Sequence, residues 1–303
     1  MSSMTSRLLP GLAVLFAALL ATVGGWSSAQ AADLSARDIM QKMDDTRLAS
    51  SESSFNRMQL TTCKYGVKNG KLKCVEKPRV KLLESAQINL GDNNKDTKSI
   101  AIVLQPASEK GIGMLSWTYD DSTRDNETWL YLSALGKVKR IAAGADEDSE
   151  PTSLFGSEIT TEDMETGKLD DYIYSIVDQG EYKGRPVYVI EAVATPERQR
   201  KTRYSKSQTW VDAERFLALK VQLYDKQGNL TKRMQVGKIE KIDGIWVTRS
   251  LTMFNLVAQR LTNMKLDGIT FGVDIDEAFL SQRALTDTAF REANLNQLRA
   301  QAK

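Results

Sequence analysis

The chain has 303 residues and a nearly balanced charge, with 41 lysine and arginine residues against 39 aspartate and glutamate residues. A net charge of only +2 argues against bulk binding of nucleic acid. The chain contains no histidine, which excludes Ser-His-Asp and Cys-His catalysis and most zinc, copper and haem sites. Its length favours one large β-domain over two small ones.

The N-terminus has the layout of a secretory signal peptide. Arg7 precedes an apolar run from Leu8 to Val23, and Ala29-Gln30-Ala31 supplies small residues in an A-x-A arrangement. We expect residues 1–31 to be removed by cleavage after Ala31, which leaves a soluble, exported mature protein. A retained membrane anchor is the alternative, but the run is short for a span of about 20 residues.

A short amphipathic helix is expected directly after the signal peptide. Ile39, Met40 and Met43 have helical spacing, and Ser35 is suited to be the N-cap, with Asp38 three residues later. The apolar stripe of this helix must cover another element.

The two cysteines, Cys63 and Cys74, flank the turn signal Asn69-Gly70. In an oxidising compartment such a pair is expected to form a structural disulfide, with no redox or metal role. A two-residue Asn69-Gly70 turn would place Cys63 opposite Glu76. We therefore expect a turn centred one residue earlier, or a bulge near Gly66.

From Phe55 onward the apolar residues alternate with period two, which predicts a long antiparallel meander. Asp243-Gly244 between two alternating runs is the strongest hairpin signal. A C-terminal amphipathic helix is expected at Thr286–Gln301. The expected strands are Arg57–Tyr65, Leu72–Glu84, Lys98–Leu104, Gly113–Tyr119, Thr128–Leu132, Val138–Ala142, Tyr172–Gln179, Pro186–Val193, Gln208–Asp212, Ala218–Tyr224, Leu230–Ile242, Ile245–Phe254 and Gln259–Ile269.

Two of these strands are apolar on both faces. In Thr128–Leu132, Trp129 and Tyr131 oppose Leu130 and Leu132, and Tyr172–Val177 shows the same pattern. A strand needs apolar residues on both sides only if both sides are covered or one faces an apolar cavity. Such strands fit a curved sheet with a helix in its concavity or over its mouth; a β-sandwich with a filled core is the alternative.

Paired carboxylates are the remaining catalytic option. Asp120-Asp121, Glu162-Asp163 and Asp170-Asp171 are sequence neighbours in turn-like segments, where adjacent side chains do not converge, so we expect solvated loops and no enzyme. The acidic run Asp146–Glu150 lacks the spaced ligands and glycine of a calcium loop and is also expected to be solvated. No metal and no cofactor are expected.

Positive charge is densest in the cysteine hairpin. It could contact anionic lipid headgroups or an acidic partner, although alternating lysines are also ordinary protection of an exposed strand edge. The basic residues are Lys64, Lys68, Lys71, Lys73, Lys77, Arg79 and Lys81.

Aromatic and methionine side chains on the strands, together with apolar residues of the loop before Met164, are candidates to line an apolar ligand cavity. Each of them could instead be a core residue, because the sequence does not say which face of a strand points inward. The candidates are Trp117, Trp129, Tyr131, Leu154, Phe155, Tyr172, Tyr174, Met234, Trp246 and Met253.

One segment of the chain resembles a known family. The block Glu127–Ile141, followed by Gly156-Ser157-Glu158 and Glu162-Asp163-Met164, is similar to the LolA-like outer-membrane lipoprotein-sorting proteins, in the larger branch found with RND-type exporters. The similarity extends from about Leu34 to Leu285, and the helix from about residue 286 onward extends past the family core. Residues 32–303 would then form a single domain with a C-terminal helical extension.

The resemblance implies a half-open antiparallel β-barrel whose concave face is closed by helices. It implies a periplasmic, monomeric carrier and no enzyme. Such a carrier would bind lipid or the acyl chains of lipoproteins and pass them to the outer membrane or an RND-type exporter. The rival hypothesis is a structural or adaptor protein with the same fold that docks on a transporter or envelope complex.

Overall fold

A computed structural model describes residues 34–48, 52–91, 94–121, 123–141, 152–164 and 168–302. The expected signal peptide and the acidic run Asp146–Glu150 lie outside the described residues. Within these ranges, no helix is long and apolar enough to cross a membrane.

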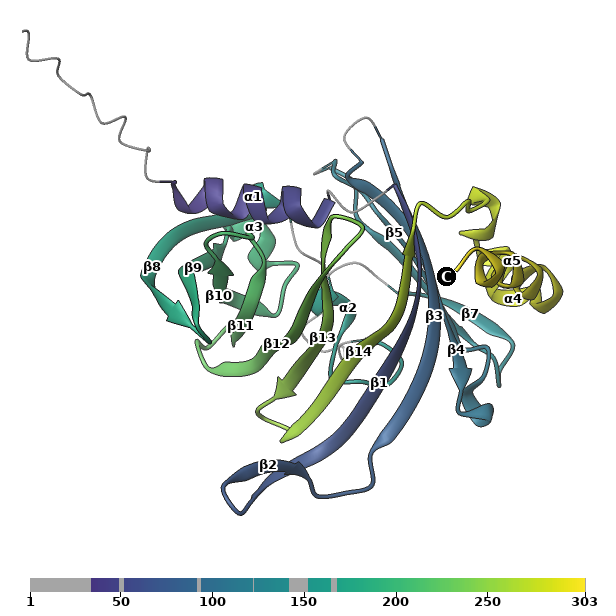
Figure 1. The fold of residues 1–303 in the computed structure, drawn as a ribbon, viewed down its shortest axis with the longest axis horizontal. Helices are drawn as coiled ribbons and strands as arrows, with labels where there is room; N and C mark the ends of the chain where they lie inside the picture. The colour runs from purple at the N-terminus through teal and green to yellow at the C-terminus, as the bar shows by residue number, and fades with distance from the viewer. Residues whose placement is uncertain are drawn as a thin grey trace, which may run out of the picture. The chain divides into compact units, whose positions relative to one another are not determined.

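The dominant element is one antiparallel sheet of fourteen strands, open between its edge strands β7 and β8 (Figure 1). Its order is β7-β6-β5-β4-β3-β1-β14-β13-β12-β11-β10-β9-β8, with β2 paired to β1 only. The strands are β1 (Ser53–Lys68), β2 (Lys71–Cys74), β3 (Arg79–Leu90), β4 (Asp96–Gln105), β5 (Gly113–Thr118), β6 (Glu127–Leu132), β7 (Lys137–Ile141), β8 (Tyr172–Tyr182), β9 (Arg185–Ala194), β10 (Tyr204–Asp212), β11 (Ala218–Asp225), β12 (Leu230–Ile242), β13 (Ile245–Asn255) and β14 (Arg260–Phe271).

The predicted meander is confirmed, with two differences. The predicted strand Leu72–Glu84 is divided into β2 and β3, because Val75–Pro78 is not part of the ladder and Pro78 has no N–H to donate. Strand β1 is inserted between β3 and β14, which joins two meanders into one sheet. Asp243-Gly244 forms the expected hairpin turn, since both residues have positive φ and Ile242 pairs with Ile245.

The register defines two continuous faces of this sheet. Asn56, Ser85, Ala101 and Met114 stand opposite one another across β1, β3, β4 and β5 on what we call the inner face. The alternate residues, such as Trp129, form the outer face, because successive side chains point to opposite sides of a strand.

The outer face of β3–β6 is covered by the C-terminal helices α4 (Gln282–Thr286) and α5 (Thr288–Gln301), seen on the far side of the sheet from α1 in Figure 1. The predicted helix Thr286–Gln301 is confirmed as α5, which begins two residues later, and α4 was not predicted. The Asp287 carboxylate caps α5 by accepting from the Phe290 N–H. This interface buries Phe55, Ala86, Ile88, Ile100, Ile102, Leu115, Trp129, Val273, Phe279, Leu280, Ala284, Leu285, Leu295 and Leu298.

A buried ion pair fastens α5 to the sheet. Glu84 of β3 is 1% exposed and accepts hydrogen bonds from Arg299 at 2.6 and 2.9 Å and from Arg57 at 2.9 Å. Because the carboxylate has two cationic partners, its loss of hydration is compensated. Helix α5 is therefore held by a specific contact as well as by apolar burial.

Helix α1 (Ala36–Leu48) covers the inner face of β8–β10. Ser35 and Asp38 form the expected capping box, with the Asp38 N–H donating to Ser35 Oγ at 3.1 Å and the Ser35 N–H donating to Asp38 Oδ2 at 3.0 Å. Ala36 and Ile39 are buried against Ile190 and other residues of the strands. The outer face of β8 is uncovered, and its Ile173 is exposed, so the expectation of two covered faces is wrong for this strand.

The disulfide Cys63–Cys74 is confirmed, but the expected turn is not. Asn69 and Gly70 form a two-residue turn with positive φ at both positions, and Lys68 pairs with Lys71. Cys74 stands opposite Tyr65, so the bridge runs diagonally to Cys63, two residues along the same face of β1. Diagonal neighbours are within side-chain reach, which makes a shifted turn or bulge unnecessary.

Asp212, at the end of β10, organises the turn into β11. Its buried carboxylate accepts hydrogen bonds from Arg185 and Arg215 side chains and from the N–H groups of Glu214 and Arg215. Burial acts to raise the pKa of Asp212, but the hydrogen bonds from Arg185 and Arg215 outweigh it and hold the pKa well below its usual range.

Glu84→Ala is expected to lower the free energy of unfolding by about 2 kcal/mol, because it removes the charge-assisted hydrogen bonds that Arg299 and Arg57 donate to the sheet. Urea unfolding at neutral pH measures this loss. Glu277→Ala is the matched control, since Glu277 pairs with Lys98 at an exposed site and should cost less than about 1 kcal/mol. Equal losses in the two variants would contradict the role given to Glu84.

Asp212→Asn is expected to flatten the dependence of stability on acid pH. A carboxylate with a lowered pKa in the folded state stabilises the protein above its unfolded pKa of about 3.9 and loses that contribution as the pH falls below it. The variant should be less stable than the wild type at pH 7 and should lose less between about pH 4 and pH 2. Urea unfolding over this range measures the difference, and parallel curves would refute the assignment.

Candidate functional site

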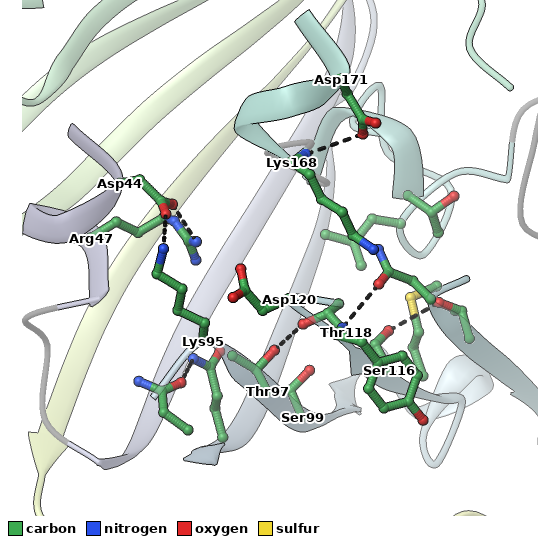
Figure 2. A pocket seen from close by; sticks show the side chains of 18 of the residues that line it. Asp44, Arg47, Lys95, Thr97, Ser99, Ser116, Thr118, Asp120, Lys168 and Asp171 are labelled. Atoms are coloured by element: carbon green, nitrogen blue, oxygen red, sulfur yellow. Dashed lines mark hydrogen bonds and ion pairs between the residues drawn. The ribbon is translucent and has the colours of Figure 1, made fainter. Parts of the chain in front are cut away.

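A cavity of about 840 Å³ lies on the inner face of the sheet. Its wall is formed by β1, β3, β4, β5, β6, β13 and β14, and α1 and residues 119, 120 and 124–126 contribute to its rim. Figure 2 shows this cavity from close by, with labelled side chains of α1, β4 and β5 turned toward a common space. The volume lies within the range of about 300–1,000 Å³ that is typical of sites for small ligands.

One end of the cavity wall is polar, and the side chains that β1, β3, β4, β5 and β6 contribute to it are uncharged. Thr97 and Thr118 hydrogen-bond to each other across β4 and β5, and Ser116 lies 3.3 Å from the Thr128 hydroxyl (Figure 2). The Asn56 Oδ1 atom is buried and has no hydrogen-bond partner among the described residues. The polar wall consists of Asn56, Ser85, Gln87, Asn89, Thr97, Ser99, Ser116, Thr118 and Thr128.

The other end of the same strands is apolar. Along β4, Thr97 and Ser99 are followed on the inner face by Ala101 and Val103, and β5 runs from Thr118 back to Met114. Each strand therefore changes from polar to apolar along its length. The apolar floor consists of Met58, Ala101, Met114, Leu154, Phe155, Met264 and Leu266.

The segment Thr152–Met164, which we call the floor loop, crosses the inner face below the cavity. Phe155 is 5% exposed and packs on Leu60, Leu83 and Met114 of the sheet. Its carbonyl oxygen accepts a hydrogen bond of 2.6 Å from Lys81 of β3. The loop thus closes one end of the space enclosed by the curved sheet.

Glu158 fastens the middle of the floor loop to the opposite strands. Its carboxylate accepts from Arg260 Nε at 2.7 Å and from Asn255 Nδ2 at 3.0 Å, and its N–H donates to Thr262 at 2.8 Å. Thr262 is fully buried and shares a hydrogen bond with Thr62. The floor loop is therefore attached to both halves of the sheet.

The C-terminal part of the floor loop is fixed by buried charge. Asp163 has no exposed side-chain surface and accepts from Lys232 Nζ at 2.6 Å and from the Tyr204 hydroxyl at 2.7 Å. Burial and then the nearby Asp163 carboxylate raise the pKa of Tyr204 above its ordinary value, so this hydroxyl stays protonated and donates. Glu162 accepts from Thr202 and from the Arg203 N–H. The expectation of a solvated loop is thus wrong for Glu162-Asp163, which anchor the loop.

Charged side chains surround the polar end of the cavity. Arg37 of α1 pairs with Asp170 at 2.5 Å, and Asp44 of α1 lies 2.7 Å from Arg47 and 3.8 Å from Lys95 (Figure 2). The Asp170-Asp171 pair therefore belongs to the rim of the cavity. The rim carries both signs of charge, as suits a surface at the border between water and a binding site.

Two of the ten predicted lining residues, Leu154 and Phe155, line the cavity. Trp117, Trp129 and Tyr131 do not: they lie on the outer face, where Trp117 and Trp129 stack edge to face at 5.0 Å beneath the C-terminal helices. The sequence pattern identified these residues as covered, but the cover is α4 and α5 and the residues belong to the core.

The remaining five predicted residues also lie outside the lining. Tyr174 packs against α1, and Tyr172 is close to Arg198, whose Nε donates to its hydroxyl at 3.3 Å. Met234 and Met253 are partners on the inner face of β12 and β13, away from the cavity. Trp246 lies between the side chains of Arg215 and Lys241.

The polar wall was missed in the sequence. Its signal was present: at one end of β3, β4 and β5 the inner-face residues are polar and uncharged, whereas a face in open water usually carries Lys and Glu. They are Ser85, Gln87 and Asn89 of β3, Thr97 and Ser99 of β4, and Ser116 and Thr118 of β5. A run of small uncharged polar residues on one face marks an enclosed polar surface.

The arrangement suits the binding of an amphipathic molecule. An apolar part can be buried on the floor at about 0.8 kcal/mol per methylene. A polar part can hydrogen-bond to the hydroxyl and amide groups above it, including the unpartnered Asn56 Oδ1. Among the described residues no three Cys, Asp or Glu side chains form a metal-binding group.

Comparisons with known proteins agree with this fold. A family model described only as an uncharacterized protein matches residues 95–287, which is well over half of the chain. No curated protein matches the chain.

Several solved structures share the fold. A DUF1329 family protein from Desulfovibrio piger has a TM-score of 0.71 and 24% identity, over 82% of this chain and 97% of that chain. A putative outer membrane lipoprotein-sorting protein domain from Vibrio parahaemolyticus has a TM-score of 0.71 and 21% identity, over 83% and 98%. A LolA superfamily protein from Nitrosomonas europaea has a TM-score of 0.58 and 15% identity, over 82% and 98%. The fold is LolA-like, as expected from the Glu127–Ile141 block.

Lys232→Met is expected to release the floor loop, because it leaves the Asp163 carboxylate buried beside Tyr204 without its cation. The cost should be about 3 kcal/mol of unfolding free energy. Hydrogen exchange at the Leu154 and Ser157 amides, which hydrogen-bond within the loop, should become faster than in the wild type. Lys206→Met removes the more exposed pair with Glu191 and serves as control. Unchanged exchange in the Lys232 variant would show that the loop does not depend on this pair.

Proposed function

Since the chain belongs to the family of uncharacterized proteins whose model matches residues 95–287, and its fold is LolA-like, we propose that it is a carrier of an amphipathic lipid or of the acyl chains of lipoproteins. The observation that carries the proposal is the cavity of about 840 Å³, open to a ligand between a polar wall and an apolar floor. A chain of about ten methylenes buried there would gain on the order of 8 kcal/mol.

A periplasmic location supports this function. The pattern of residues 1–31 predicts export through a cleavable signal peptide, and the Cys63–Cys74 disulfide is of the kind that persists in an oxidising compartment. An acyl chain that has to cross such an aqueous space needs a binding site that excludes water.

We propose that the ligand is passed to an acceptor at the outer membrane or to an RND-type exporter. This destination rests on the resemblance of the sequence to lipoprotein-sorting proteins. Transfer requires that the acceptor bind the ligand more tightly or that the cavity change shape. The chain itself needs no catalytic residue for either route.

The rival hypothesis of an adaptor that docks on a transporter or envelope complex and carries no ligand is less well supported. In an adaptor the inner face could be filled by side chains, as the outer face is filled under α4 and α5. The inner face instead carries nine small or medium-sized polar side chains around an open space. Such a surface costs stability unless it is used, because apolar packing would stabilise the sheet more.

Mass spectrometry of the protein purified from its native envelope tests the proposal. We expect lipid or acylated peptide to co-purify with the wild type and to fall at least tenfold in Ser99→Trp, whose indole would occupy the cavity. Ser175→Trp is the matched control, because Ser175 lies on the exposed outer face of β8, and it should retain the ligand.

Thermal unfolding of both variants shows whether the folds are intact. Reproducible absence of any lipid or acylated species from the wild type would refute the carrier. Equal ligand content in the Ser99 and Ser175 variants would place the ligand outside this cavity.

A further inference from the structure

Exposed apolar side chains are concentrated in the disulfide-linked hairpin. Among the described residues, eight large apolar side chains are at least 45% exposed, and four of them fall within residues 67–80. Val67 is 73% exposed, Val75 is 61% exposed and Leu72 is 50% exposed. Val257, in the adjacent β13–β14 turn, is 76% exposed, and this turn contacts the base of the hairpin where the Tyr65 N–H donates to the Gln259 carbonyl.

The two faces of the hairpin differ in chemistry. Val67 and Leu72 stand opposite each other on the face that also carries Tyr65 and the disulfide. The cross-strand pair Lys68 and Lys71 lies on the other face. Residues 64–80 contain six basic side chains, Lys64, Lys68, Lys71, Lys73, Lys77 and Arg79, all exposed.

Within residues 64–80 this positive charge is not balanced by acidic side chains. The only acidic residue in the segment, Glu76, is engaged by Arg260 at 3.0 Å and by the Lys64 N–H at 2.8 Å. Protection of a strand edge explains the lysines, but it does not explain an apolar pair on the same two strands, because edge protection replaces apolar residues by charged ones. The combination of apolar tip and basic flank matches a surface with anionic groups above an apolar layer.

We propose that the hairpin Lys64–Val80 docks the protein on an anionic lipid surface. The lysines contact the headgroups, each contributing about a fivefold increase in affinity, while Val67 and Leu72 enter the boundary of the acyl layer. The disulfide holds the two strands together, so that little ordering is needed on docking. The hairpin continues from the end of β1 remote from Asn56, so docking would leave the charged rim of the cavity facing away from that bilayer (Figure 1).

Vesicle flotation of the full-length mature protein tests this proposal. The wild type should float with mixed vesicles of phosphatidylethanolamine and phosphatidylglycerol, and should bind phosphatidylcholine vesicles at least tenfold more weakly. High salt should weaken the binding, since it screens charges beyond a few ångströms. Lys68→Gln/Lys71→Gln/Lys73→Gln should reduce affinity on the order of 100-fold, and Val67→Ser/Leu72→Ser at least fivefold.

Two exposed sites elsewhere supply matched controls. Lys137→Gln/Lys139→Gln on β7 and Leu135→Ser in the β6–β7 turn remove the same types of side chain and should bind as the wild type does. The proposal is overturned if the wild type fails to float, if it binds phosphatidylcholine equally well, or if the control variants lose as much as the hairpin variants. If the hairpin binds only an acidic protein, the wild type will fail to float with the vesicles.

The result of the vesicle-binding test does not depend on the proposed carrier function. The Val67→Ser/Leu72→Ser variant should keep the co-purifying ligand, because neither residue lines the cavity. Loss of vesicle binding with retained ligand would assign the hairpin to docking alone.

Discussion

The structure depends on where the apolar surface of strands β3–β6 is buried. A sheet must cover its apolar face, and here the cover is external: α4 and α5 pack on Ile100, Ile102, Leu115 and Trp129, and the Glu84–Arg299 pair holds them in place. Because the outer face supplies this apolar core, the polar end of β3, β4 and β5 does not have to be packed on its inner face. It can carry serine, threonine and asparagine around an open space without loss of the main apolar interface.

The opposite half of the sheet uses the reverse arrangement. There α1 covers the inner face of β8–β10, and the outer face of β8 is exposed. The apolar core of this sheet therefore lies on its outer face at β3–β6 and on its inner face at β8–β10. The cavity lies on the inner face of the half that α4 and α5 cover from outside, and α1 supplies part of its rim.

The floor loop limits the depth of this space. Its contacts are unusually polar for a segment in the interior of a curved sheet, with Glu158 and Asp163 each paired to a cation of the strands β14 and β12. Buried ion pairs define a position more sharply than apolar packing does, since their hydrogen bonds are directional. The loop can thus be held in one place while Phe155 supplies the apolar surface beneath a ligand.

Local patterns in the sequence determined the strands, the Asp243-Gly244 turn, the α1 cap and the disulfide, because each depends on residues that are near one another in the chain. The block Glu127–Ile141 was sufficient to indicate the LolA-like fold. The sequence also indicated, through Trp129 on one side and Leu130 on the other, that both faces of β6 are covered or that one of them faces an apolar cavity. Only the tertiary structure decided which cover lies on which side, since alternation along a strand is the same whichever face points inward. That choice moved the aromatic residues from the cavity into the core and made the cavity wall polar.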